Sequence, residues 1–278
     1  MMTTGPKQRA KKSGGSTATA FGTESWSGVP EAFRQANRSL SAPWQGLFGP
    51  LRLGLADDMV VVGQFGQSID ARIATETGDS KYINGPDGLA HLHRLRALVD
   101  AVVVGVGTAV ADDPQLTVRH VEGPNPARIV VDPRSRLPQN ARLLAADGVR
   151  RLVITGEQAR AGFPASIEVV QLPAPDGHIA PAEILRALAQ RGLRRILIEG
   201  GADTVSRFIA AGCLDRLHVV IAPIIIGAGP SSVRLPPVSS MAQVLRAPMR
   251  AHILGDEVLL DCDLSAQRVA IGAANIST

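Results

Sequence analysis

Apolar, β-branched residues recur in short runs from residue 59 onward, and this pattern predicts most of the secondary structure. The run at residues 59–65 has the length and continuous apolar character of a buried strand. Similar runs predict strands at residues 101–106, 128–132, 151–155, 167–172, 195–199, 217–222, 250–254 and 258–264. Helical spacing predicts helices over residues 181–191 and 202–211, and one after Asn84-Gly85-Pro86 that carries Leu89, Leu92, Leu95 and Val99.

The order of these elements predicts how the sheet is built. Between residues 195 and 222, a strand, the tight turn Gly200-Gly201, a helix stopped by Gly212 and a second strand follow one another. Such a strand–helix–strand crossover implies parallel pairing. Gly255-Asp256 separates the last two strands and is a hairpin signal. We therefore expect an α/β fold, with a mostly parallel mixed sheet, helices on both faces and a C-terminal antiparallel hairpin.

Composition divides the chain into four parts. Residues 1–25 are small, polar and basic without an apolar central segment, so we expect a disordered leader rather than a secretory signal. Residues 26–56 are too short for a core of their own and should pack on the main domain. That domain is expected over residues 57–264, followed by a tail at residues 265–278.

The overall composition is that of a globular protein, because 45% of the 278 residues are hydrophobic and 19% are charged. No apolar run approaches the roughly 18 to 20 residues of a membrane span, so we expect no membrane association. The net charge of +4 lies wholly in the first fifty residues, which argues against a nucleic-acid-binding main domain. Two cysteines, Cys213 and Cys262, cannot form a disulfide framework or a four-thiolate zinc site. We expect a cytoplasmic protein without a metal centre.

Three polar clusters follow strands, where open α/β sheets bind ligands. The first spans residues 66–84 and is rich in hydroxyl, amide and basic groups. The second, at residues 105–119, begins with Gly105-Val106-Gly107, but Val110 occupies the third glycine position of the dinucleotide fingerprint, and Asp112-Asp113-Pro114 is also typical of a simple turn. The third runs from Glu199 to Arg207. There a glycine turn opens a helix whose unpaired N–H groups suit a phosphate, although an ordinary helix start has the same pattern.

Arg96 is expected at the edge of the buried face of its helix, because it lies four residues after Leu92 and seven after Leu89. A partly buried guanidinium needs an anion, and either a ligand phosphate or an internal carboxylate would satisfy it. His91 and His93 are two residues apart on this helix and do not share one face, so they do not form a zinc pair.

Several ordered blocks resemble the reductase domain of riboflavin biosynthesis over about residues 57–264. They are residues 68–74, 78–83, 93–96, 104–108, 111–119 and 198–201. The resemblance implies a dihydrofolate-reductase-like fold, a homodimer, and the NADPH-dependent reduction of the ribose of 5-amino-6-(5-phosphoribosylamino)uracil to a ribityl chain. It implies that the cofactor supplies the hydride, while the protein contributes positioning and charge.

Carried over by position, the resemblance also implies a set of site residues. Asp70, Arg72 and Glu199 match catalytic positions. Ser80, Arg96, Leu116, Arg119 and Glu199 match substrate-binding positions. Cofactor-binding positions are matched by Gly66, Tyr82, Asn84, Thr108, Asp112, Gly201, Ala202, Asp203, Thr204, Val205, Ser206 and Arg207. Arg134, Arg136 and Arg160 are three candidates for attracting an adenosine 2′-phosphate.

The sequence departs from the family's pattern at several of these positions. Asp70-Ala71-Arg72 replaces the usual Asp-Gly-Lys or Asp-Gly-Arg, Tyr82 replaces a tryptophan, Asn84 a common threonine and Pro133 a common serine. Residues 1–56 contain no His or Cys, so the zinc signature of the deaminase often fused to this reductase is absent and we expect no deamination.

Two other functions stay open at this point. A reductase of the same fold could act on a dihydropterin such as dihydrofolate. A non-catalytic nucleotide- or nucleic-acid-binding module could use the basic leader.

Overall fold

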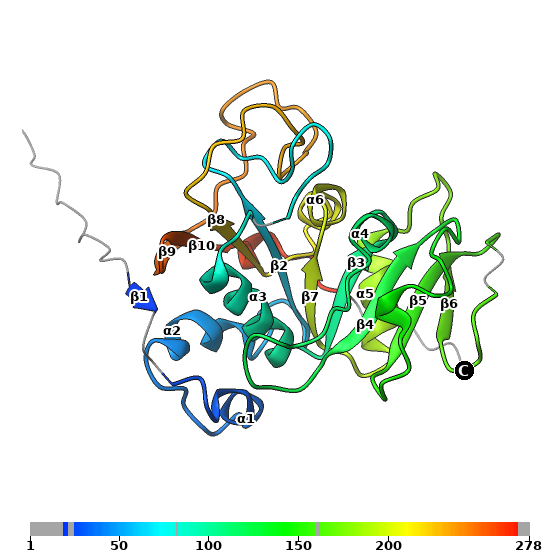
Figure 1. Cartoon of the computed structure of the whole chain (residues 1–278), viewed down its shortest axis with the longest axis horizontal. Helices are drawn as coiled ribbons and strands as arrows, with labels where there is room; N and C mark the ends of the chain where they lie inside the picture. Colours follow the sequence, from blue (N-terminus) through cyan, green and yellow to red (C-terminus); the bar gives the residue numbers. More distant parts are fainter. Residues whose placement is uncertain (1–18, 22–24, 82, 160–161, 272–278) are drawn as a thin grey trace, which may run out of the picture.

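The computed structural model describes residues 19–21, 25–81, 83–159 and 162–271, and one ten-stranded sheet forms the centre of this part of the chain (Figure 1). The strands lie in the order β1-β9-β10-β8-β2-β7-β3-β4-β5-β6. All strands from β8 to β6 run parallel, and β10 pairs antiparallel with both β8 and β9. The parallel strands therefore place their carboxyl ends along one edge of the sheet. The strands are β1 (Thr19–Phe21), β2 (Val60–Gln67), β3 (Ala101–Gly105), β4 (Ala127–Asp132), β5 (Arg151–Gly156), β6 (Glu168–Leu172), β7 (Arg195–Glu199), β8 (Arg216–Ile221), β9 (Met249–Leu254) and β10 (Glu257–Asp263).

Helices cover both faces of the sheet, as the sequence predicts. Alternate residues of the central strands enter two separate hydrophobic cores, because successive side chains of a strand point to opposite faces. One core contains α1 (Val29–Arg34), α2 (Trp44–Phe48) and the buried side of α3 (Pro86–Leu98). The other contains α5 (Pro181–Ala189) and α6 (Ala202–Ala210). Short 3-10 turns complete the list at η1 (Gly49–Leu51), η2 (Arg142–Leu144) and η3 (Ser265–Gln267).

The α/β fold and each predicted strand and helix are confirmed, with differences of one or two residues at most ends. Helix α4 (Val106–Asp112) is an addition, since the sequence predicts only a glycine-containing polar cluster there. Gly105 is its extended N-cap, and the alanines that follow favour helix. Residues 19–21 need a correction, because they form β1 and pair with β9 rather than belonging to a disordered leader. The rest of the leader, except for residue 25, lies outside the described residues.

The segment that precedes the sheet packs on helix α3 through aromatic side chains. Trp44 stacks on Phe48 with ring centroids 5.7 Å apart, and Phe48 stacks in turn on His91 of α3 at 5.9 Å. The guanidinium of Arg94, also on α3, lies 5.0 Å from the ring centroid of Trp44. Residues 26–56 therefore complete one core rather than forming a separate one.

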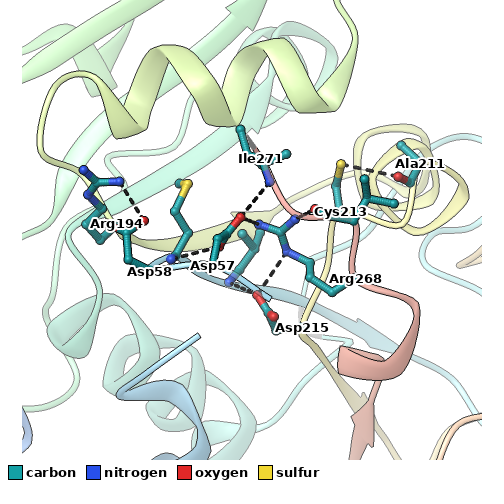
Figure 2. A network of polar contacts seen from close by, with 11 residues as sticks. Asp57, Asp58, Arg194, Ala211, Cys213, Asp215, Arg268 and Ile271 are labelled. Atoms are coloured by element: carbon teal, nitrogen blue, oxygen red, sulfur yellow. Dashed lines mark hydrogen bonds and ion pairs between the residues drawn. The ribbon is translucent and has the colours of Figure 1, made fainter. Parts of the chain in front are cut away.

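The segment after β10 is anchored at the amino edge of the sheet (Figure 2). The side chain of Arg268 is fully buried and lies between two carboxylates, Asp215 and Asp57. Asp57 also accepts the backbone N–H of Ile271 at 2.7 Å, and Asp215 accepts that of Val61 at 2.7 Å. This network ties residues 268–271 to the start of β2. Within the described residues, no helix is long and apolar enough to cross a bilayer.

Candidate active site

A cavity of about 770 Å³ opens at the carboxyl ends of β2, β3 and β7. Glycines allow its walls to come together at these ends. A Cβ on Gly66 would lie 1.5 Å from Asn84 Oδ1, and one on Gly105 would lie 2.4 Å from Thr204 Oγ1. Gly200 has φ +104°, a conformation that side chains disfavour. The three strand ends therefore bring bare backbone to the cavity.

The turn between β7 and α6 is fixed by a neighbouring helix. The N–H of Gly201 donates to Thr108 Oγ1 of α4 at 2.8 Å. Gly201 is the extended N-cap of α6 and has no side chain to cap the helix. The first-turn residues Ala202, Asp203 and Thr204 line the cavity, so the positive end of the α6 dipole faces it. This arrangement suits a phosphate group.

Arg96 and Glu199 form a buried ion pair in the cavity wall. The guanidinium of Arg96 donates from Nε to Glu199 Oε2 at 2.9 Å and from Nη2 to Oε1. Its Nη1 donates to the carbonyl of Thr117 at 3.0 Å. The anion that Arg96 needs is therefore the internal carboxylate, the second of the two partners considered from the sequence. The pair presents a neutralised, directional polar group to the cavity.

Arg119 lies near this pair and adds a further positive charge. Partial burial and the charges of Arg96 and Arg142 lower the pKa of the Arg119 guanidinium, although Glu199 opposes the shift. His93 accepts the backbone N–H of Arg119 at its Nδ1, 2.9 Å away. Burial and the neighbouring charges of Arg96, His120 and Arg119 lower the pKa of His93 to about 3. His93 is therefore neutral near pH 7 and accepts a hydrogen bond between two arginines.

Further cations line the cavity beyond the end of β4. Arg134 and Arg136 lie in its wall, and neither forms a hydrogen bond or ion pair within the described ranges. The Arg134 guanidinium lies against Gly177, whose φ is +71° and whose added Cβ would come within 2.4 Å of Nη2. Arg207 is already paired with Asp203 at 2.9 Å. Arg160 lies outside the described residues, so Arg134 and Arg136 are the candidates that the structure places here.

Most of the residues implied by the resemblance meet in this cavity. Those that line it are Gly66, Ser80, Asn84, Arg96, Thr108, Asp112, Glu199, Gly201, Ala202, Asp203, Thr204 and Arg207. Tyr82 lies outside the described residues. The remaining six are not among the lining residues: Asp70, Arg72, Leu116, Arg119, Val205 and Ser206.

Asp70 and Arg72 hold a long loop in place instead. The Asp70 carboxylate accepts the backbone N–H groups of Ile226 and Gly227, and hydrogen bonds from Ser68 and Ile226 lower its pKa to about 2. The Arg72 guanidinium donates to the carbonyls of Gly227 and Gly229 and to Ser231 Oγ. Residues 67–81 and 222–248 consequently lie side by side at the top of Figure 1.

The helical geometry of α6 explains why part of the run from Gly201 to Arg207 faces away from the cavity. Val205 is fully buried in the core below the helix. Ser206 is also buried, and its hydroxyl accepts the N–H of Arg234 at 2.8 Å. With about 3.6 residues per turn, consecutive residues of a helix cannot all face one ligand. Leu116 is likewise a core residue, only 1% exposed.

Several lining residues carried no functional signal in the sequence. Gly177, His178 and Arg234 come from irregular segments far from the recognised blocks, and only the folded chain brings them together. Among the described residues, no group of three or more His, Cys, Asp or Glu side chains is arranged to hold a metal ion.

Comparison with known proteins agrees with this architecture. The family model described as the RibD C-terminal domain matches residues 59–253. A curated relative from Methanothermobacter thermautotrophicus, named 2,5-diamino-6-ribosylamino-4(3H)-pyrimidinone 5′-phosphate reductase, is 32% identical over 205 residues, which are 70% of this chain and 93% of that protein. The riboflavin biosynthesis protein RibD of Mycobacterium tuberculosis is 33% identical over 206 residues, or 71% of this chain and 53% of that protein.

A solved structure shows the same fold. The deaminase/5-amino-6-(5-phosphoribosylamino)uracil reductase of Thermotoga maritima superposes with a TM-score of 0.64 at 27% identity, covering 74% of this chain and 56% of that one. The chain thus spans about half the length of the RibD proteins it matches and nearly all of the archaeal reductase. On the family match and these identities, the chain belongs to the RibD C-terminal domain family.

Proposed function

We propose that this chain is an NADPH-dependent reductase of riboflavin biosynthesis that converts the ribose of 5-amino-6-(5-phosphoribosylamino)uracil to a ribityl chain. The observation that carries the proposal is the cavity that joins the α6 helix start, the Arg96–Glu199 pair and the cations beyond β4. The relatives named as reductases support it. The archaeal relatives are named for the 2,5-diamino analogue, so the substrate class is a ribosylaminopyrimidine 5′-phosphate.

The lining residues fit a dinucleotide phosphate. Bare backbone at Gly200 and Gly201 and the first turn of α6 would hold the pyrophosphate. Arg134 and Arg136, which lack partners within the described residues, would hold the adenosine 2′-phosphate. When bound, the cofactor supplies a hydride. The pair of unpartnered guanidinium groups is the feature that favours NADPH over NADH.

The protein's own part in the reaction is to bind and orient the substrate. Glu199 offers carboxylate oxygens at the strand end, where Arg96 holds them in a fixed plane. A carboxylate in this position accepts hydrogen bonds from amino and hydroxyl groups of a pyrimidine or an opened sugar. Arg119 lies close to Arg96 and Arg142 and adds positive charge near the cavity without lining it.

We further infer a cytoplasmic homodimer. Exposed apolar side chains gather on the two loops that Asp70 and Arg72 join: Ile69, Ile225, Val238 and Met241 are each more than half exposed. Such side chains favour burial against a second copy. Sedimentation equilibrium of the purified chain tests this, and a monomer at micromolar concentration would contradict it.

The deciding experiment follows NADPH absorbance when the purified chain meets 5-amino-6-(5-phosphoribosylamino)uracil, its 2,5-diamino analogue or dihydrofolate. We expect oxidation with a ribosylaminopyrimidine and none with dihydrofolate. Oxidation of NADPH with dihydrofolate alone would indicate a pterin reductase instead. No oxidation with any of the three substrates would contradict a reductase of either kind.

Glu199→Gln tests the assigned role of the carboxylate within the same assay. We expect turnover to fall by about a hundredfold, because a hydrogen bond to a charged group contributes about 1.5 to 3 kcal/mol. The dissociation constant for NADPH should stay within about threefold of the wild-type value. An equal loss of turnover and cofactor affinity would contradict a substrate-specific role.

A further inference from the structure

Glu257 is a buried carboxylate beside the cavity that belongs to none of the recognised blocks. It is the first residue of β10, and only 4% of it is exposed. Its position lies beyond the stretch matched by the family model, which ends at residue 253. A carboxylate buried this deeply has to be compensated by hydrogen-bond donors.

Three N–H donors from the start of α3 satisfy the Glu257 carboxylate. Oε1 accepts the backbone N–H of Gly85 at 3.0 Å and the Nδ2 group of Asn84 at 2.8 Å. Oε2 accepts the backbone N–H of Gly88 at 2.7 Å. Gly85 is the N-cap of α3 and has no side chain of its own to cap the helix. Glu257 therefore replaces the missing cap from a distant strand and places negative charge at the positive end of the helix.

The same carboxylate determines which way the Asn84 side chain faces. A carboxamide has a donor end and an acceptor end, and a carboxylate accepts only from the donor. With Nδ2 bound to Glu257, the other end of the carboxamide, Oδ1, lies over Gly66 in the cavity wall, where a Cβ on residue 66 would come within 1.5 Å of it. Asn84 and Gly66 both line the cavity, at the end of β2. A side chain at position 66 would prevent this approach.

We propose that Glu257 is a positioning residue, which fixes the Asn84 carboxamide so that its oxygen accepts a hydrogen bond from the bound nicotinamide cofactor. This inference rests on the proposed function, because Asn84 lines the cavity assigned to NADPH. It goes further in naming a residue outside the matched family stretch and the chemical role it plays. Glu257 contacts Asn84 and the α3 backbone and is not itself among the residues that line the cavity.

A double-mutant cycle separates positioning from helix capping. Cofactor dissociation constants are measured by the fluorescence of bound NADPH in the absence of substrate, for the full chain and for Glu257→Gln, Asn84→Ala and the double variant. Glutamine keeps the shape but turns one acceptor into a donor that faces N–H groups. We expect Glu257→Gln to weaken NADPH binding about tenfold in the wild-type background and less than twofold in the Asn84→Ala background.

Asp87→Asn is the matched control. Asp87 is an exposed acidic residue in the first turn of the same helix, so its loss removes charge from the helix start without touching Asn84. Its dissociation constant for NADPH should stay within twofold of wild type. If Glu257→Gln does not fold, Glu257→Asp, which keeps the charge but shortens the side chain, takes its place in the cycle.

The outcomes distinguish this inference from the proposed function. If the wild type binds NADPH and Glu257→Gln weakens binding equally in both backgrounds, or in neither, the positioning role is overturned. The reductase assignment then stays intact. Wild type that binds no NADPH overturns the cofactor assignment and the positioning role together. Loss only when Asn84 is present supports the inference.

Discussion

Arginines lie at both edges of the sheet, and two sets of them differ in burial and pairing. At the amino edge, Arg268 is enclosed between Asp57 and Asp215, as Figure 2 shows, and Arg194 pairs with Asp58 at 2.9 Å. At the carboxyl edge, Arg134 and Arg136 line a cavity and have no partner among the described residues.

Burial explains the difference. A guanidinium buried in the protein needs a carboxylate partner beside it. A guanidinium that borders a cavity is solvated by water and can bind the anion of a ligand. A second hollow, at the amino edge, is also lined by charged side chains, but Arg195 there pairs with Asp100 and Arg216 pairs with Asp263. Arg250 also borders this second hollow without a hydrogen bond or ion pair among the described residues, so neither cavity size nor unpaired charge alone identifies the active site. The glycine turn at the start of α6 distinguishes the cavity at the carboxyl edge.

Arg268→Met should produce the largest effect and should act on stability alone. Removing the guanidinium leaves the buried Asp215 carboxylate and the largely buried Asp57 carboxylate without their partner, and breaking a buried pair costs about 3 to 5 kcal/mol. Burial already raises the pKa of Asp215 despite Arg268, so this carboxyl is poorly placed to remain charged. Urea unfolding at pH 7 measures the loss.

Arg194→Met provides the control for that prediction on the same edge. Its partner Asp58 is 70% exposed at the side chain, so the pair is screened by water and should contribute about 0 to 1 kcal/mol. Under conditions in which each variant is folded, both should bind NADPH with the wild-type dissociation constant. A change in cofactor affinity in Arg268→Met would mean that the two edges are coupled.

Arg134→Ala tests the other side of the comparison. If this arginine binds the adenosine 2′-phosphate, its loss should weaken NADPH binding about thirtyfold. This factor corresponds to about 2 kcal/mol, within the range of about 1.5 to 3 kcal/mol for a charge-assisted hydrogen bond. NADH lacks that phosphate and is the internal control, so its affinity should stay unchanged. Fluorescence titration with both cofactors measures the ratio. An equal loss for both would show that Arg134 contacts another part of the cofactor or supports the fold, and Arg136→Ala would then be measured in its place.

The parallel strands and their crossover helices could be predicted from the sequence because local apolar runs determine them. The sequence does not predict helix α4, since Gly105 and Gly107 disfavour helix and the helix is only seven residues long. Short helices depend on packing more than on their own propensity.

The site was less predictable than the fold because its chemistry depends on pairs that are distant in the sequence. Arg96 was expected at a buried edge, but only the structure shows that Glu199, 103 residues away, is its anion. Glu257 had no signal at all, since a carboxylate that caps a helix from another element leaves no local pattern. Val205 and Ser206 were included because a run of matched positions ignores which face of a helix each residue occupies.

Thr108→Val should give the smallest effect. It separates the contribution of the glycine turn at the carboxyl edge from that of the arginines there. Valine has the same shape as threonine but cannot accept the N–H of Gly201, so the turn before α6 loses its 2.8 Å anchor. A hydrogen bond of this kind contributes about 1 kcal/mol, which corresponds to about a fivefold loss of NADPH affinity. Thr108→Ser keeps the hydroxyl and should restore the affinity to within twofold of wild type. If serine fails to rescue it, the threonine methyl group and its packing, rather than the hydrogen bond to the turn, hold the phosphate-binding backbone in place.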